Sequence, residues 1–425
     1  MMRILVVGAG GREHAIVRRL AHDQARHDLH AAPGNPGIAA LATVHAVAMQ
    51  HPEGVVALAK RLDADLVVIG PEQPLADGLA DQLKAAGRAV MGPTAACACL
   101  ETSKAFAKEF MAAHGIPTAR FHVCRSTAEA VAAIDEFGIP VVVKADGLAA
   151  GKGVVVAMTR HEAVEAVEAA MELHRFGRAG DVLVVEECLV GVEASFFALC
   201  DGEHAVYLGS AQDHKRVFDH DRGPNTGGMG AFSPSPLIDD AMRERVMREI
   251  VQPVVDGMRA AGDPYTGVLF VGLMLTASGP KVIEFNVRFG DPETQVVLPL
   301  LRGDLGELLL RTATGRLGGH VVERTGGAAV AVVLASGGYP GTFKRGHLIS
   351  GMAEADALPG VHVIHAGTTR TSSGDVLTDG GRVLAVVAEA TDVAAAIGQA
   401  YNGVSCLDFE GMHYRHDIGR RALER

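Results

Sequence analysis

Short apolar runs alternate with amphipathic stretches over the first hundred residues. Residues 3–7, 65–69 and 89–91 are apolar and each run is followed by glycine, which indicates strands that end in loops. A helix is expected over residues 12–20. Strands that alternate with helices predict a parallel sheet, and such sheets bind ligands at the loops beyond the carboxyl ends of their strands.

Beyond residue 101 the pattern changes to α+β. A helix is expected over residues 103–114, and Ser126/Glu129 and Thr159/Glu162 have the spacing of capping boxes at the starts of two more helices. Strands are expected at 141–145, 154–158, 182–186, 269–275 and 281–286. We therefore predict a multidomain α/β and α+β protein with three parts. These are an N-terminal parallel-sheet domain (1–101), a two-lobed core (102–325, with a mobile lobe at about 120–190) and a small C-terminal α/β module (326–425).

The composition narrows the class of protein. The chain has 425 residues, 48% of them hydrophobic and 21% charged, as in ordinary globular domains. A net charge of −11 argues against a nucleic-acid partner, which needs an excess of cations. The six cysteines form no C-x-x-C pair, and no apolar run approaches the roughly 20 residues of a membrane span. We expect a cytoplasmic protein with reduced thiols and no membrane association.

A glycine-rich stretch, K-A-D-G-L-A-A-G-K-G-V at 144–154, is the first candidate for a phosphate site. It does not match the P-loop pattern, because Gly147 to Gly151 is one residue too short and Gly153 replaces the hydroxyl residue. The β-branched run after it predicts a strand, so the loop 146–152 joins two strands. Its backbone N–H groups and Lys144 are suited to a triphosphate; a flexible surface loop is the alternative.

The segment after residue 182 is the candidate for the rest of a nucleotide. An apolar strand ends in Glu186, Glu187, Cys188 and Leu189, which resembles a hinge between two lobes. Glu186 and the backbone beside it are expected to meet an adenine edge, and Glu193 to hold ribose hydroxyls. The alternative is that these glutamates are ordinary surface acids.

Strand periodicity gives the strongest chemical signal. In V-I-E-F-N-V-R-F-G-D at 282–291 it places Glu284, Asn286 and Arg288 on one face of a strand, with Ile283, Phe285 and Val287 packed on the other. One carboxylate and one amide oxygen, completed by phosphate oxygens and water, suit Mg²⁺ or Mn²⁺. A face of structural salt bridges is the alternative.

Two further segments are candidates for substrate recognition. In Q-D-H-K-R at 212–216, Asp213 is suited to the ammonium of a small zwitterion whose carboxylate would meet Arg288. A solvated loop is the alternative there. Near the N-terminus, Gly8 and Gly10 are followed by Glu13 rather than a third glycine, which disfavours NAD binding. A phosphate cradle with Arg12 is favoured, and a purely structural turn is the alternative.

Taken together, these motifs resemble the ATP-grasp ligases, and more narrowly the phosphoribosylamine–glycine ligase family. The resemblance spans nearly the whole chain. It is carried by G-G-R-E-H at 10–14, P-G-N at 33–35, G-P-E at 70–72, S-K-A-F at 103–106, the glycine-rich stretch at 144–154, Q-D-H-K-R at 212–216, G-P-N-T-G-G-M-G at 223–230, E-F-N-x-R-F-G-D-P-E-T-Q at 284–295, A-S-G-G-Y-P-G at 335–341 and R-H-D-I-G-x-R-A at 415–422.

The resemblance implies an ATP-dependent ligation of glycine to 5-phosphoribosylamine through glycyl phosphate, in purine biosynthesis, with Mg²⁺ or Mn²⁺. It implies catalytic roles for Arg288, Asp213 and Lys215 and metal ligation by Glu284 and Asn286. The implied nucleotide-binding residues are Lys104, Lys144, Gly147, Gly151, Lys152, Gly153, Glu186, Glu187, Leu189 and Glu193. The implied substrate-binding residues are Gly10, Gly11, Arg12, Asn35, Glu72, Asp213, Asn225, Arg288, Gly290 and Asp291.

One departure from the superfamily concerns a second metal ion. Strand 269–275 lacks the additional carboxylate that many ATP-grasp enzymes place there, so a second ion is less expected than the first. Another amine or carboxylate ligase of nucleotide metabolism, an NAD-dependent oxidoreductase and a nucleotide sensor without catalytic activity are the rival functions. We expect a monomer or weak dimer.

Overall fold

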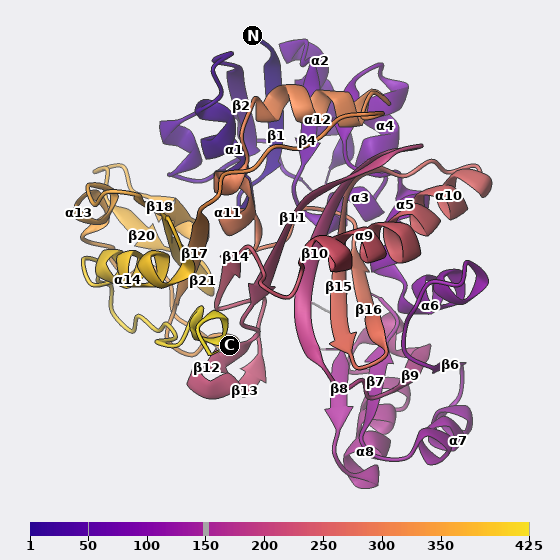
Figure 1. Ribbon diagram of the computed structural model, residues 1–425. Coiled ribbons are helices and arrows are strands. Elements are labelled where there is room, and N and C mark those ends of the chain that lie inside the picture. The colour runs from indigo at the N-terminus through magenta and orange to yellow at the C-terminus, as the bar shows by residue number, and fades with distance from the viewer. Residues whose placement is uncertain (50, 148–152, 425) are drawn as a thin grey trace.

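The computed structural model describes residues 1–49, 51–147 and 153–424. Its N-terminal part is a five-stranded parallel sheet in the order β3-β2-β1-β4-β5 (Figure 1). Residues Ile4 to Val7 of the central strand are fully buried, because helices cover both faces of the sheet. The elements are β1 Arg3–Gly8, α1 Gly11–Ala21, β2 Asp28–Pro33, β3 Thr43–Val44, α2 Pro52–Leu62, β4 Leu66–Ile69, α3 Glu72–Ala76, α4 Leu79–Ala85, β5 Ala89–Met91 and α5 Ala95–Thr102. The predicted parallel sheet is confirmed.

A four-stranded antiparallel sheet in the order β6-β9-β7-β8 forms a small lobe at the lower right of Figure 1. Helices α7 and α8 pack on one face, against Val141, Val143 and Val185. The predicted capping box at Thr159 closes in both directions, since Glu162 N–H donates to Thr159 Oγ1 and Thr159 N–H donates to the Glu162 carboxylate. The elements are α6 Lys104–Ala113, β6 Phe121–Cys124, α7 Thr127–Phe137, β7 Val141–Ala145, β8 Val154–Ala157, α8 Arg160–Met171 and β9 Leu183–Glu187.

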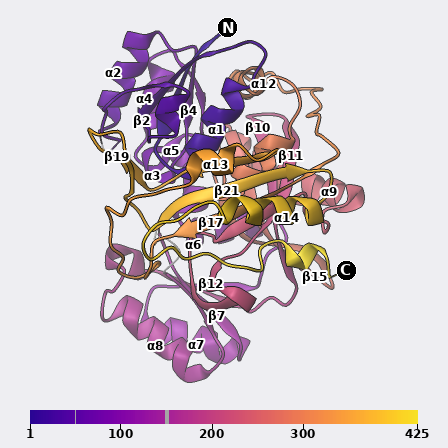
Figure 2. The same ribbon diagram turned by 90° about the vertical axis from the view of Figure 1, so that its left-hand side faces the viewer.

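An eight-stranded antiparallel sheet forms the centre of the molecule, in the order β16-β15-β10-β11-β14-β17-β21-β18. Its C-terminal strands continue the sheet of the core, because Gly230 of β14 pairs with Val332 of β17. Helix α14 (Val393–Val404) packs against the C-terminal strands β17 and β21 (Figure 2). The strands are β10 Val192–Asp201, β11 Ala205–Asp213, β14 Gly230–Ser233, β15 Thr266–Thr276, β16 Gly279–Asn286, β17 Ala328–Ala335, β18 Val361–His365 and β21 Arg382–Ala390.

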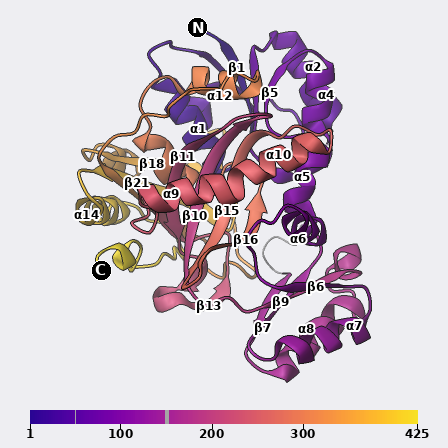
Figure 3. The same ribbon diagram turned by 45° about the vertical axis from the view of Figure 1, so that its right-hand side comes forward.

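A long helix crosses in front of this sheet in Figure 3. It consists of α9 Asp240–Val246, one π-helical turn at Met247–Val251 and α10 Gln252–Ala260. Pro253 has no N–H to donate to the preceding turn, which accounts for the local widening. The remaining elements are β12 Arg216–Phe218, β13 Arg222–Asn225, α11 Thr294–Val297, α12 Leu305–Ala313, α13 Met352–Asp356, β19 Thr368–Arg370, β20 Val376–Thr378 and α14 Val393–Val404. Over the described ranges, no helix is long and apolar enough to cross a membrane.

Candidate active site

A buried cluster of two lysines and one glutamate links the small lobe to helix α6. Lys144 Nζ lies 2.9 Å from Glu186 Oε1, and Lys108 Nζ lies 3.0 Å from Glu186 Oε2. Strand alternation points Lys144 and Glu186 away from α7 and α8, because their neighbours Val143 and Val185 pack on those helices. Burial lowers the pKa of Lys108 to about 8, and Glu186 opposes that effect. Both oxygens of Glu186 therefore have cationic partners within the protein.

A β-bulge brings Lys144 against the strand that carries the predicted metal ligands. Leu273 pairs with Val282 and Gly272 with Glu284, so Ile283 is an extra residue in β16. The carbonyl oxygen of Ile283 accepts a hydrogen bond from Lys144 Nζ at 3.2 Å. Ile283 is half-buried and does not follow the predicted alternation, because the bulge interrupts it; Phe285 and Val287 are buried as predicted.

Glu284 and Asn286 extend from β16 into a cationic neighbourhood. Burial acts to raise the pKa of Glu284, but the charges of Lys215, Lys144, Lys104 and Arg288 hold it below its ordinary value. Among the described residues, the Glu284 carboxylate has no ion pair within 4.0 Å. An ionised carboxylate next to an amide oxygen is a donor set that fits a hard divalent cation.

Lys104 connects the glycine-rich loop to this neighbourhood. Its Nζ donates to the carbonyl oxygen of Gly147 at 3.1 Å, and the negative charge of Glu284 acts to raise its pKa. Asp146 accepts from Ser103 Oγ and from the N–H of Ala105, which fixes the loop to the start of α6. Burial lowers the pKa of Lys104.

The other end of the glycine-rich loop returns to β8. The carbonyl oxygen of Gly153 accepts from Ala145 N–H at 2.8 Å. Gly151 and Lys152, which were predicted to bind the nucleotide, lie outside the described residues.

Three acidic groups and Lys215 gather at the end of β11. Glu193 and Lys215 form an ion pair of 2.9 Å. Burial raises the pKa of Asp213, the last residue of β11, while Lys215 opposes the shift. Glu293 is buried, and burial together with the Asp213 charge raises its pKa to about 7. Glu293 was not predicted as a site residue, although it lies in the D-P-E-T-Q motif at 291–295. Three carboxyl groups thus surround one ammonium group, an arrangement of hydrogen-bond acceptors that suits an ammonium ligand.

Arg288 joins the predicted substrate site to the N-terminal part. Its Nη2 donates to Glu101 Oε1 at 2.9 Å and to Asn286 Oδ1 at 3.1 Å, and its Nε lies 3.3 Å from Glu72 Oε2. Glu101 also accepts from the N–H of Val287. Glu101 was not predicted, because it lies at the end of α5 with no pattern to distinguish it from an ordinary helical acid.

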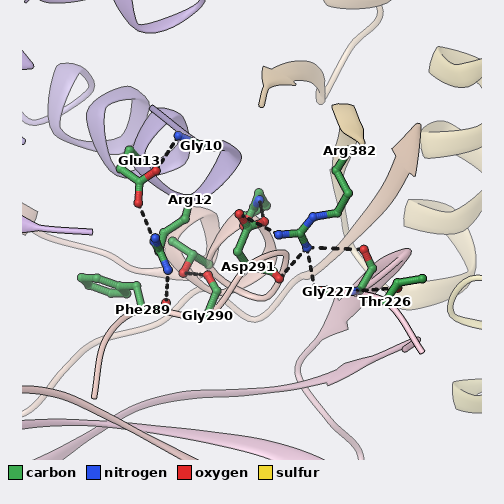
Figure 4. A network of polar contacts seen from close by, with 12 residues as sticks. Gly10, Arg12, Glu13, Thr226, Gly227, Phe289, Gly290, Asp291 and Arg382 are labelled. Atoms are coloured by element: carbon green, nitrogen blue, oxygen red, sulfur yellow. Dashed lines mark hydrogen bonds and ion pairs between the residues drawn. The ribbon is translucent and has the colours of Figure 1, made fainter. Parts of the chain in front are cut away.

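The N-terminal glycines cap α1 beside the same site. Gly10 N–H donates to Glu13 Oε2 at 2.6 Å, and Arg12 Nε donates to Glu13 Oε1 at 2.5 Å. Arg12 Nη1 donates to the carbonyl oxygen of Phe289 at 3.3 Å (Figure 4). It also lies 3.9 Å from Glu72 Oε2. The phosphate-cradle residues thus lie against the loop that follows β16.

The remaining predicted residues differ in whether their side chains are available to bind a substrate. Asn35 Nδ2 donates to the carbonyl oxygens of Ala9 and His365, and its Oδ1 accepts from Gly37 and Ile38, so its side chain is fully used within the protein. Asn225 is exposed on β13. A Cβ on Gly11 would lie 2.8 Å from Gln295 Nε2, and one on Gly290 would lie 2.5 Å from Glu293 Oε2, so those two side chains would have to move.

A second cluster of potential metal ligands lies between the end of α1 and the start of α12. His27 Nε2 lies 3.1 Å from Asp304 Oδ1 and 3.5 Å from Asp23 Oδ2. His27 Nδ1 accepts from Met2 N–H, so Nε2 carries the proton in the neutral ring and donates to Asp304. Asp23 accepts from two backbone N–H groups of α12. This cluster is a structural joint rather than a cation site.

Models of one protein family match almost the entire chain. Residues 2–101 match the phosphoribosylglycinamide synthetase N domain, 102–294 match its ATP-grasp (A) domain and 329–421 match its C domain. The chain belongs to the phosphoribosylglycinamide synthetase family. The resemblance and the fold class predicted from the motifs are confirmed.

Individual members of the synthetase family align with this chain over nearly their full lengths. The chain is 48% identical over 424 residues to a phosphoribosylamine–glycine ligase of Brucella melitensis, covering 100% of this chain and 99% of that protein. It is 49% identical to the ligase of Caulobacter vibrioides with the same coverage. The crystal structure of the Thermotoga maritima ligase superimposes with a TM-score of 0.83 at 34% identity, covering 98% of this chain and 99% of that one. Family membership implies use of ATP and a divalent metal.

Proposed function

We propose that this chain is a phosphoribosylamine–glycine ligase, which joins glycine to 5-phosphoribosylamine at the expense of ATP. The products are glycinamide ribonucleotide, ADP and phosphate, in purine biosynthesis. The observation that supports this most is the convergence of three parts on one place. Lys144 of the small lobe contacts β16 and acts on Glu284. Arg288, which follows β16, and Arg12 of α1 both lie near Glu72, so the glycine cap of α1 is linked to the same place.

ATP is assigned to the side of the site formed by the small lobe. Lys144 and Lys104 supply positive charge for the phosphates, and the loop that contains Gly147, Gly151, Lys152 and Gly153 is proposed to close over them. Since Glu186 is held by Lys108 and Lys144, we assign it the positioning of Lys144. Adenine would then meet the backbone around Glu187 and Leu189, where the strand leaves the small lobe.

A divalent cation, Mg²⁺ or Mn²⁺, would be held by Glu284 and Asn286. The fit is supported by the ionised carboxylate of Glu284, which has no ion-pair partner among the described residues, and by the amide oxygen beside it. When bound, such an ion neutralises phosphate charge and orients the transferred phosphoryl group. Strand β15 carries no carboxylate next to this pair, so a single ion is assigned.

Glycine is assigned to the acidic group at the end of β11. The carboxyl groups of Asp213 and of the neighbouring Glu293 would accept hydrogen bonds from the glycine ammonium. Lys215 and Arg288 would present positive charge to the glycine carboxylate. A glycine carboxylate oxygen attacks the γ-phosphorus of ATP; the bond from that phosphorus to the β-bridging oxygen breaks, giving glycyl phosphate and ADP. No nucleophile from the protein is needed, so positioning and electrostatics supply the catalysis.

Phosphoribosylamine is assigned to the side formed by α1 and the loop after β16. The N–H group of Gly11 and the Arg12 guanidinium would face its phosphate. Gly10, whose N–H donates to Glu13, would border the phosphate, and Glu72, Asn225, Gly290 and Asp291 would border the sugar. The amine nitrogen attacks the carbonyl carbon of glycyl phosphate. The C–O bond to phosphate then breaks, and the nitrogen loses one proton. Asn35 is assigned a positioning role for the loop at 33–38, because its side chain has no free donor or acceptor.

The test is ADP release by the purified chain with ATP, Mg²⁺, glycine and phosphoribosylamine, coupled to detection of glycinamide ribonucleotide. We expect turnover that depends on all four components. Turnover with bicarbonate in place of glycine, or ADP release unaffected by phosphoribosylamine, would point to another ATP-grasp ligase. We also propose a cytoplasmic monomer or weak dimer; the six free cysteines are consistent with a reducing compartment.

A further inference from the structure

A single arginine from the C-terminal part of the chain joins two loops of the proposed active site. Arg382 is the first residue of β21, and about a fifth of its side chain is exposed. Its Nη1 donates to the carbonyl oxygens of Gly227 at 2.6 Å and Asp291 at 2.7 Å (Figure 4). Its Nη2 lies 3.2 Å from Asp291 Oδ2. The guanidinium therefore binds the glycine-rich loop at 226–230 and the loop after β16 at the same time.

The carboxylate of Asp291 is held in one orientation by these contacts. Gln295 Nε2 donates to Asp291 Oδ1 at 2.8 Å, and Arg382 pairs with Oδ2. Oδ2 lies 3.7 Å from the position of a Cβ on Gly10, so it lies beside the start of α1. Burial acts to raise the pKa of Asp291, but Arg382, followed by Arg12, holds it below its ordinary value. Asp291 is thus an ionised group beside the proposed phosphate cradle.

The glycine-rich loop is fixed from its other end as well. The N–H and Oγ1 of Thr226 both donate to the carbonyl oxygen of Lys215, at 2.7 and 2.8 Å, and Gly227 N–H donates to Tyr339 Oη at 3.1 Å. Gly228 has φ +112°, and a Cβ there would lie 2.4 Å from Pro292 Cδ. The loop therefore packs directly on the residue after Asp291, and Arg382 fills the corner between the two loops.

We propose that Arg382 is a positioning residue for phosphoribosylamine, holding Asp291 and the 226–230 loop at the face that this substrate occupies. The inference rests on the proposed function. Within the described residues, the hydrogen bonds and ion pairs of its guanidinium all go to these two loops. None of them reaches the groups assigned to ATP and the metal, which are Lys104, Lys144, Glu284 and Asn286. Loss of Arg382 should therefore affect the amine substrate rather than the nucleotide.

Arginine is suited to this position by its geometry. A planar guanidinium offers several donors in fixed directions, so it can serve two carbonyl oxygens and one carboxylate together, whereas an ammonium is a point charge on a flexible stem. The two preceding glycines allow close packing of neighbouring segments. A Cβ on Gly381 would lie 2.3 Å from Tyr339 Cδ2, and one on Gly380 would lie 2.9 Å from Gly367 Cα. In the sequence, the contacts of Arg382 are marked only by two glycines and an arginine before an apolar strand.

The test compares Arg382→Ala, Arg382→Gln and Arg382→Lys with the unchanged chain. Arg345→Ala is the matched control, because Arg345 is an exposed arginine of the same part whose one ion pair among the described residues is with Asp379. The measurements are kcat/KM for phosphoribosylamine, KM for glycine, Kd for a non-hydrolysable ATP analogue by calorimetry, and the melting temperature.

For Arg382→Ala we expect kcat/KM for phosphoribosylamine to fall about 10²-fold, the effect of a substrate-positioning group displaced by about 1 Å. The ATP-analogue Kd and the glycine KM should stay within about threefold, Arg382→Lys should recover only part of the loss, and Arg345→Ala should behave as the unchanged chain. If Arg382→Ala does not fold, Arg382→Gln is judged by the same criteria.

Two results would overturn the inference. One is a kcat/KM for phosphoribosylamine within threefold of the unchanged chain in a folded Arg382 variant. The other is an equal loss in nucleotide affinity and in phosphoribosylamine use, as a purely structural role would give. Failure of the proposed function is recognised separately, because the unchanged chain would then not turn over phosphoribosylamine.

Discussion

Lys144 on β7 and Glu186 on β9 form an ion pair of 2.9 Å in which both side chains are almost fully buried. Glu186 also pairs with the buried Lys108, so two ammonium groups share one carboxylate. Burying a charge without a partner is costly, so the cluster is stable only when it is complete. It also keeps Lys144 extended toward the carbonyl oxygen of Ile283, next to the proposed metal ligand Glu284.

Replacing Glu186 with Gln should therefore affect both stability and nucleotide binding. Two buried lysines would lose their counter-charge, which we expect to cost roughly 3–5 kcal/mol in the free energy of unfolding. The affinity for an ATP analogue should fall, because Lys144 is no longer held. Urea unfolding and calorimetric titration measure the two effects.

The control for this experiment is Asp135→Asn, which removes one partner of the exposed Arg160 ion pair. Such exposed pairs contribute about 0–1 kcal/mol. If Glu186→Gln were no more destabilising than Asp135→Asn, the cluster would not have the role we assign to it.

Glu284→Ala should abolish turnover while the protein stays folded. The carboxylate is surrounded by cations but has no ion-pair partner among the described residues, so its charge is available to a metal. We expect kcat to fall at least about 10³-fold, with loss of the Mg²⁺-dependent part of nucleotide affinity. Glu244→Ala, at an exposed position of α9, is the control. Near-normal turnover in Glu284→Ala would rule out the metal assignment.

Glu293 should make the protein less stable as the pH rises. Its folded pKa of about 7 lies above the ordinary glutamate value of 4.5, because of burial and the nearby Asp213. The folded state therefore binds more protons than the unfolded state between these two values, and stability decreases across that window as pH increases. Full ionisation at pH 8 carries a cost on the order of 1–3 kcal/mol.

The isosteric variant Glu293→Gln removes this cost. It should be more stable than the unchanged chain at pH 8, and the difference should shrink as the pH falls toward 4.5. Its turnover should nevertheless fall, because the glycine ammonium loses part of its binding charge. Urea unfolding at pH 5 and pH 8 measures the difference, and a stability gain that is the same at both pH values would refute the assignment.

Arg415 should be required for docking of the C-terminal tail. It is almost fully buried and pairs with Asp221 at 2.9 Å and Asp417 at 2.7 Å. Arg415→Ala leaves Asp417 without its cationic partner and Asp221 with Arg421 alone. We expect a loss of about 3 kcal/mol in unfolding free energy.

The pH dependence gives a second check on Arg415. Burial acts to raise the pKa of Asp417, but hydrogen bonds from Arg415 hold it well below its ordinary value of 3.8. This stabilisation is present above pH 3.8 and is lost as the pH falls below it. The acid-unfolding midpoint should therefore move to higher pH in Arg415→Ala, while Arg420→Ala should leave it unchanged.

Features that depend on neighbours in the chain were predictable from the sequence. The alternation of residues along β16 placed Glu284 and Asn286 together because side chains in a strand point alternately to opposite faces. The capping box at Thr159 depends on hydrogen bonds over three residues. Glycines at strand ends marked the loops of the parallel sheet for the same local reason, and the family resemblance is carried by long motifs that are contiguous in the chain.

Partners that are distant in the sequence were not predictable. The two lysine partners of Glu186 lie 42 and 78 residues earlier, and only the folded structure brings all three together. Glu101 and Arg382 gave too little signal by themselves, yet they hold Arg288 and Asp291. Ile283 left its expected face because of a bulge whose position depends on the strand beside it.

The sequence by itself thus determined those groups of the proposed site that lie in local motifs with their own periodicity, whereas Glu101 and Arg382 lie in no such motif. Only the tertiary structure decided which charges neutralise one another. A buried charge takes whichever partner the packing of separate elements brings within hydrogen-bond distance, and that distance is set by the whole fold rather than by the spacing along the chain.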